Sequence, residues 1–295
     1  MGYLFLAVSV LVAQAKGYFG KRVSGCTKTL HEAALASTLR MVLCAGVGFV
    51  TVIAAGGFGS LAASAATLRA AALSGGATAA FVIIWLILVR RNAYMLPEIF
   101  SMLGVLIPLI ASEILYGEQI TLIQWLGIGV LFAAAFLMCF HSASIKGKIT
   151  LPTVGLLFLY GIVCGLGDFS QKLFVKSDPQ GSAAVFNFYT YLFATVLLVA
   201  ASFFTRSKDE RVDPALLRKI AGYIAIMAVS LFASAYFKTR AAAYLDAVLI
   251  FPLVQGANLL FAAGMSAIMF RERLTVKAIV GMVAAFTGLM MINLL

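Results

Sequence analysis

The chain has 295 residues, of which 63% are hydrophobic and only 11% are charged. A soluble domain is nearer half apolar and a quarter charged, so this composition excludes a water-soluble globular protein and predicts an integral membrane protein. The net charge of +11 does not indicate nucleic-acid binding, because the basic residues lie in short segments between apolar runs, where they set membrane topology.

Apolar runs of about 20 residues, separated by charged or turn-forming residues, predict an all-α protein with ten transmembrane helices. In the first half of the chain the predicted helices cover 2–20, 34–55, 70–90, 94–116 and 121–141. In the second half they cover 152–175, 183–204, 219–238, 242–270 and 274–294. The first run is expected to be a retained helix, because no basic stretch precedes it and no clear signal-peptide cleavage site follows.

An internal repeat relates the two halves. Residues 112–134 align without gaps on residues 266–288, at an offset of 154. The identical pairs are Ser112/Ser266, Ile114/Ile268, Glu118/Glu272, Thr121/Thr275, Gly127/Gly281 and Phe132/Phe286. Five helices are an odd number, so the halves must enter the membrane in opposite orientations. We therefore predict two inverted five-helix repeats, 1–148 and 149–295, in one compact membrane domain, an architecture typical of transporters.

The distribution of lysine and arginine predicts the orientation. Loops that follow odd-numbered helices hold about 16 basic residues with their flanks, whereas loops that follow even-numbered helices hold five. Those five are Arg69, Lys172, Lys176, Lys238 and Arg240. By the positive-inside rule the odd-numbered loops are cytoplasmic and both termini lie outside.

The end of each half carries a recognisable pattern. Gly117-Glu118-Gln119-Ile120-Thr121 precedes a helix with Gly127, and Arg271-Glu272-Arg273-Leu274-Thr275 precedes a helix with Gly281. This pattern resembles the EamA-type members of the drug/metabolite transporter superfamily. The resemblance implies ten helices, alternating access and a central cavity lined mainly by the first four helices of each half. It also implies cytoplasmic termini, which differs from the charge count.

Ionisable side chains inside a membrane are costly and therefore need a reason. Glu98, Asp168 and Arg40 are candidates for binding a polar substrate or, for the carboxyls, a coupling proton. The alternative is that they lie at the headgroup level, which is the expected position of Asp246 and Lys16.

Uncharged polar residues deeper in the helices are further candidates for a substrate site. Gln255 and Asn258 share one helix face, Ser101 corresponds to Gln255 through the repeat, and Gln14 lies deep in the first helix. Tyr18 and Trp85 would add aromatic walls that can stack on a ring or hold a cation. The alternative role of the polar groups is hydrogen bonding between helices.

Two further features have structural interpretations. Glu118 and Glu272 are expected to cap the helices that follow them rather than to bind substrate. Pro97, Pro108 and Pro252 are expected to kink their helices and free backbone carbonyls.

Two rival functions stay open at this point. Gly165-Leu166-Gly167-Asp168-Phe169 matches the Gly-x-Gly-Asp element of intramembrane aspartyl proteases, with Asp246 as the second aspartate that such an enzyme needs. The partner aspartate of those proteases precedes this element, however, whereas Asp246 follows it. A non-transporting membrane scaffold is the other alternative.

The sequence thus predicts a non-enzymatic, multi-pass transporter of the cell membrane, with a small organic metabolite as its substrate. No cofactor, metal or nucleotide-binding motif is recognised. Coupling to a proton or ion and assembly as a homodimer are compatible with this interpretation.

Overall fold

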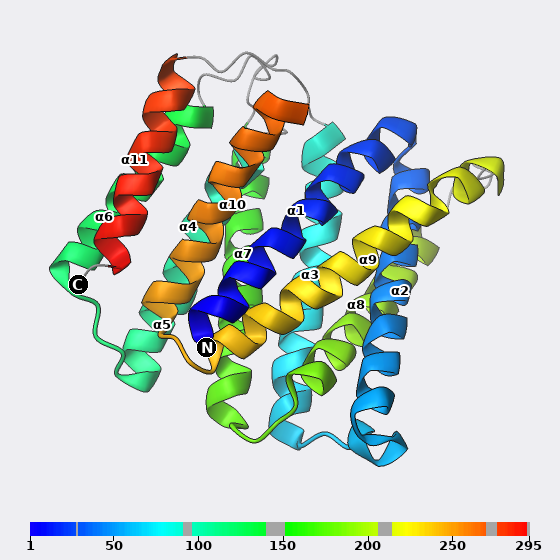
Figure 1. Cartoon of the computed structure of the whole chain (residues 1–295). Helices are drawn as coiled ribbons and strands as arrows, with labels where there is room; N and C mark the ends of the chain where they lie inside the picture. The colour runs from blue at the N-terminus through cyan, green and yellow to red at the C-terminus, as the bar shows by residue number, and fades with distance from the viewer. Residues whose placement is uncertain (28, 91–95, 140–150, 206–213, 270–275, 294–295) are drawn as a thin grey trace. The chain divides into compact units, whose positions relative to one another are not determined.

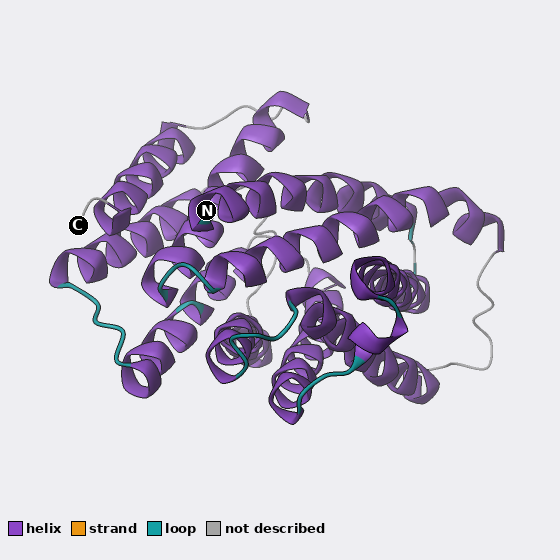
Figure 2. Cartoon of the chain, turned by 60° about the horizontal axis from the view of Figure 1, so that its bottom comes forward, coloured by secondary structure: helices purple, strands orange, loops and turns teal. Residues whose placement is uncertain are grey.

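The computed structural model describes residues 1–27, 29–90, 96–139, 151–205, 214–269 and 276–293. In chain order its helices are α1 (Gly2–Cys26), α2 (Leu30–Gly56), the short 3-10 helix η1 (Phe58–Leu61), α3 (Ala65–Arg90), α4 (Leu96–Gly104), α5 (Leu106–Tyr116), α6 (Leu122–Cys139), α7 (Leu151–Ser177), α8 (Ala183–Thr205), α9 (Pro214–Ala242), α10 (Ala247–Met269) and α11 (Val276–Asn293). The described residues outside these helices form short loops and turns (Figures 1 and 2).

Ten helices lie in the described residues if α4 and α5 are taken as one interrupted helix, which confirms the predicted all-α fold and helix number. Six of them are long and apolar enough to cross a membrane by length and composition. Within the described residues these spans are Gly2–Gly20, His31–Gly56, Ala65–Leu88, Leu151–Ser177, Ala183–Ser202 and Arg218–Ala242. Four shorter apolar helices lie at Phe100–Tyr116, Leu122–Ala135, Ala247–Asn258 and Ile279–Ile292.

The break between α4 and α5 has a local cause. Pro108 has no backbone N–H to donate to the carbonyl of Gly104 four residues earlier, and its ring would clash with that carbonyl. The helix accordingly ends at Gly104 and resumes at Leu106, with the Val105 N–H donating to Met102 O at 3.0 Å. Pro252, in contrast, lies inside the uninterrupted helix α10.

The chain divides into two compact units, and each takes segments from both halves of the sequence. Unit 1 comprises Met1–Leu86 and Ser170–Tyr244, and unit 2 comprises Ile87–Phe169 and Leu245–Leu295. This division describes packing, so the proposed repeats 1–148 and 149–295 stay a prediction.

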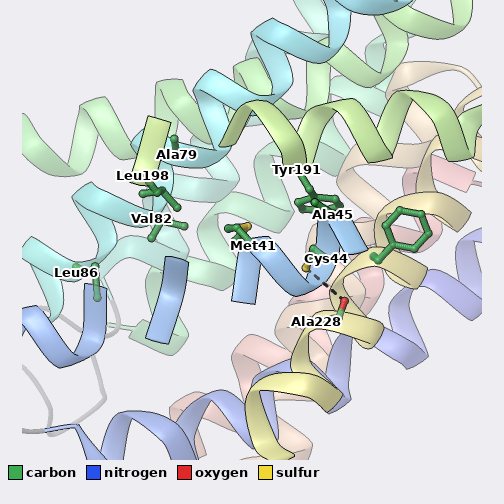
Figure 3. Close-up of a cluster of buried hydrophobic side chains, with 10 residues drawn as sticks. Met41, Cys44, Ala45, Ala79, Val82, Leu86, Tyr191, Leu198 and Ala228 are labelled. Atoms are coloured by element: carbon green, nitrogen blue, oxygen red, sulfur yellow. Dashed lines mark hydrogen bonds between the residues drawn. The ribbon is translucent and has the colours of Figure 1, made fainter. Parts of the chain in front are cut away.

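In unit 1, α1 pairs with α9 over most of its length, and α2 packs against α8 and α9. Its buried core includes a cluster of ten side chains from α2, α3, α8 and α9, nine of which are labelled in Figure 3. The loop before α2 is closed by a capping box, in which Glu32 N–H donates to Thr29 Oγ1 and Thr29 N–H donates to Glu32 Oε2.

Unit 2 contains close contacts between glycines of neighbouring helices. A Cβ at Gly127 of α6 would lie 2.9 Å from the carbonyl oxygen of Gly288 in α11, so these two helices need glycine to approach this closely. Gly161 and Gly165 of α7 likewise face Gly104, where any Cβ would overlap a backbone carbonyl. In Figure 1 α6 begins beside the end of α11, so the two helices run antiparallel, as opposite insertion of the two halves requires.

Candidate functional site

The eight predicted site residues fall in both units. Unit 1 holds Gln14, Tyr18 and Trp85, and unit 2 holds Glu98, Ser101, Asp168, Gln255 and Asn258. Glu98 belongs to α4, but its side chain lies outside the described residues.

Gln14 and Tyr18 lie one turn apart on α1, and both are half-buried. Gln14 Nε2 donates to the carbonyl of Val10 at 3.1 Å, within its own helix. The Tyr18 hydroxyl accepts a hydrogen bond from Arg22 at 3.1 Å, and the Arg22 guanidinium carbon lies 5.5 Å from the Tyr18 ring centroid. Tyr18 therefore already holds a cation from the protein itself, which competes with the predicted role of holding a cationic substrate.

Trp85 lies on α3 and is half-buried against the cluster of Figure 3. Two other aromatic side chains, Phe81 and Tyr236, are partly buried against the same cluster. Trp85 therefore packs within unit 1 and keeps some accessible surface.

Polar residues of α4 and α10 provide the candidates in unit 2. Ser101 is 6% exposed, and Gln255 and Asn258 are half-buried rather than among the exposed residues. Helices α4 and α10 contact each other, and Leu253 of α10 packs against the buried cluster that contains Met102 of α4. The structure therefore brings the backbones that carry these three polar residues into one helix group.

Asp168 is buried on α7, with 7% of its surface exposed. Lys172 follows one turn later and is 2% exposed, so an acid and a base share one face of the helix at the spacing that favours charge pairing. Lys172, which the charge count placed among the loop-flanking basic residues, lies inside α7 with its side chain buried. The four-residue spacing from Asp168 was the sequence signal that could have identified it.

The carboxylate of Glu118 caps a helix, but not the one that was expected. The first N–H of α10, at Ala247, donates to Glu118 Oε2 at 2.8 Å. Helix α6, which follows Glu118, has its own capping box between Thr121 and Gln124. Glu118 therefore joins the ends of two helices that are distant in sequence, and Glu272, its repeat equivalent, lies outside the described residues.

A second carboxylate contact lies in unit 1, between the start of α3 and the loop after α7. Asp178 Oδ2 accepts hydrogen bonds from Ser64 Oγ at 2.5 Å and from Thr67 Oγ1 at 2.7 Å. These bonds, the Ser64 bond most, and a backbone bond from Gly181 hold the pKa of the Asp178 carboxyl below its usual value. Asp178 stays ionised and anchors this loop to α3.

A family model matches the second half of the chain, from residue 151 to residue 294, and its description is EamA-like transporter family. Residues 151–294 are an EamA-like transporter domain. A solved crystal structure of another protein resembles the whole chain, with a TM-score of 0.74 at 13% sequence identity over 99% of this chain and 96% of that one. At this identity the likeness shows the fold alone. No curated protein matches the chain in sequence.

The EamA-like domain comprises α7–α11 and confirms the resemblance inferred from the Glu-x-x-Thr pattern. The protein is a multi-pass membrane protein, and its EamA-like domain indicates a transporter with a small-molecule substrate. Members of this family are normally not enzymes, which weighs against the protease alternative.

The Gly-x-Gly-Asp segment has a packing role in the EamA-like domain. Gly165 of α7 lies against the backbone carbonyl of Gly104 in α4, and a Cβ there would overlap that carbonyl. This glycine therefore permits close contact between α7 and α4. Asp246 is exposed and precedes the first residue of α10, whereas Asp168 is buried within α7. Their unlike surroundings give no support to a pair of aspartates that shares a proton.

Proposed function

We propose that the protein is a secondary transporter that moves a small organic metabolite across the membrane by alternating access. Its substrate site would lie near the midplane where the two five-helix repeats meet, with contributions from Gln14, Tyr18, Trp85, Glu98, Ser101, Asp168, Gln255 and Asn258. The family of residues 151–294 supports transport as the activity.

The observation that carries the proposal is the polar face of α10. Successive residues of a helix are turned by about 100°, so Gln255 and Asn258 lie about 100° and 160° round the helix from Gly256. Gly256 is the contact point with α6 and α11, since its Cβ would meet Leu289 and Leu131. The two amides thus point away from the face that α10 uses for packing on α6 and α11.

The neighbours of these amides on α10 support a position that faces protein rather than lipid. Phe251 and Val254 lie on the same side of α10 as Asn258 and are 0% and 7% exposed. Amide side chains on such a protected face of a membrane helix can donate to and accept from a polar substrate. Asp168 is a buried carboxyl in a spanning helix and is therefore a candidate to carry the proton that couples to transport.

Transport by purified protein in liposomes tests this function. Exchange of radiolabelled metabolites across the liposome membrane should identify a substrate, and Gln255→Ala or Asn258→Ala should slow its exchange by about tenfold or more, because each removes hydrogen bonds to a buried polar ligand. Thr287→Ala is the matched control, since Thr287 is an exposed residue of α11 whose hydroxyl donates to Val283 O. Equal exchange by all three variants would refute the site on α10.

A further inference from the structure

The strongest unexplained feature of unit 1 is a cation in the middle of a membrane span. Arg40 is in α2, whose span covers His31–Gly56. At 1.5 Å per residue, its Cα lies about 5 Å along the helix from the centre of that span. A charged side chain at this depth is costly and marks a functional position unless a partner neutralises it.

Arg40 belongs to the buried stripe of α2 rather than to its lipid-facing side. Ala36 and Cys44, one turn before and one turn after it, are 5% and 0% exposed. Ala36 packs on Ile220 and Ile224 of α9, and Cys44 Sγ donates to Ala228 O of the same helix at 3.4 Å (Figure 3). The Arg40 side chain therefore projects from a face of α2 that other helices cover.

Within the described residues nothing neutralises this cation. Its Nε is fully enclosed and has no hydrogen-bond partner there. The ionisable groups that interact electrostatically with it are the Cys44 thiol and the Tyr191 phenol, which are neutral at physiological pH. Both direct their protons elsewhere, since the Tyr191 hydroxyl donates to Leu231 O at 3.4 Å and Cys44 donates to Ala228 O.

Lys172, a buried cation among the described residues of unit 1, differs in this respect. Lys172 has Asp168 one turn away on its own helix, whereas α2 carries no carboxylate one turn from Arg40. Arg40 as a whole residue is half-buried, although its Nε is fully enclosed.

We propose that Arg40 binds the negatively charged group of the transported substrate, so the substrate is a small organic anion. A guanidinium presents five donors in a planar fork that fits a carboxylate or phosphate through two parallel hydrogen bonds. Trp85 and Phe81, partly buried against the cluster that flanks Arg40, would cover the apolar part of such an anion. This inference rests on the proposed transport function and names the chemical class of its substrate.

The first experiment measures binding by thermal stabilisation of the full-length protein in a neutral detergent. The probes are benzoate, phenyl phosphate and succinate, each compared with a neutral or cationic analogue: benzamide, phenol, succinamide and benzylamine. An anion that binds the folded state should raise the unfolding temperature of the unmodified protein, and its uncharged analogue should not. No stabilisation by any of the three anions, or equal stabilisation by the neutral analogues, would overturn the proposal.

Variants then assign the effect to Arg40. Arg40→Gln should abolish the anion-induced shift, and Arg40→Lys, which keeps the charge but loses the planar fork, should weaken anion binding by about tenfold. Arg69→Gln is the matched control, because it removes the same charge from an exposed position of α3. If Arg40→Gln does not fold, Arg40→Lys carries the test. Undiminished anion binding by either folded variant would contradict the proposal.

Two further arms separate the sources of the anion and the two proposals. Phosphatidylglycerol and phosphatidylcholine are added to the same samples, and an Arg40-dependent shift caused by phosphatidylglycerol alone would assign Arg40 to a lipid headgroup and overturn a substrate role. In liposomes, a neutral solute whose exchange needs Gln255 but not Arg40 would refute the anion inference and leave transport intact. An anion that binds through Arg40 but never crosses the membrane would refute transport and leave the anion site intact.

Discussion

Glu118 shows how one residue can be assigned the correct kind of role and the wrong partner. Its position just before Thr121 predicted a helix cap, and helix N-termini do favour a carboxylate. The structure gives that carboxylate to Ala247, 129 residues further along the chain, while Gln124 completes the cap of α6. Sequence spacing reveals local caps only, so a cap made between distant helices could not be predicted.

The contribution of this cap can be measured directly. Glu118→Ala should lower the free energy of unfolding by about 1 kcal/mol, because it leaves the first N–H of α10 without its acceptor. Glu113→Ala is the matched control, since Glu113 is an exposed residue of α5 and the substitution removes the same charge. Denaturation in mixed micelles provides the measurement. A loss of stability that is as large for Glu113→Ala as for Glu118→Ala would show that charge, rather than the cap, is responsible.

At the scale of helices, the hydrophobic runs and the charged or turn-forming residues between them predicted where helices occur but not how they pack. The ten runs correspond to α1–α11, and α9 begins at Pro214, a residue that suits a first helical turn. Pro108 was expected to kink its helix, and it does interrupt it at Gly104. The contact of Gly104 with Gly161 and Gly165 lies beyond sequence reasoning from one chain, because many glycines in membrane helices contact nothing of the kind.

The pair α6 and α11 offers a sharp comparison of two glycines. Gly127→Ala should destabilise the protein by about 1–3 kcal/mol, since the added Cβ would lie 2.9 Å from Gly288 O and from Ile292 Cγ1. Gly129→Ala, the same change two residues later, meets nothing within 4 Å and should be neutral or stabilising, because alanine favours helix. Thermal unfolding of both variants decides the matter, and destabilisation of the two by similar amounts would contradict a close contact at Gly127.

The candidate site was predictable only in part for the same reason. Depth and polarity singled out Gln255, Asn258 and Ser101, none of which lies among the exposed residues. The burial of Lys172 and the enclosed Nε of Arg40 emerge only when neighbouring helices are placed round them. Which of these groups meets a substrate is not encoded in the periodicity of a single helix.

For the whole molecule, the buried position of Lys172 sharpens the charge asymmetry. With this side chain buried, four basic residues remain in the loops and flanks after the even-numbered predicted helices. About 16 lie in those after the odd-numbered predicted helices. Gln180 lies in the exposed turn after α7, which is the sixth predicted helix. We therefore expect a cysteine introduced at Gln180 to react with a membrane-impermeant maleimide added to intact cells. Lys208→Cys, in the loop after the seventh predicted helix, should react only after the membrane is permeabilised. All native cysteines are replaced for this measurement, and the reverse labelling pattern would establish cytoplasmic termini.

The composition of the two units also has a consequence for synthesis on the ribosome. Unit 2 combines residues 87–169 with residues 245–295, so 75 residues of unit 1 are translated in between. At about 10 residues per second, on the order of ten seconds separate the end of α6 at Cys139 from the start of α10 at Ala247. During that interval Gly127 lacks its contact with Gly288, and Glu118 has no Ala247 to cap. The nascent chain therefore passes through a stage in which α6 lacks its packing partner α11, and residues 245–295 supply it.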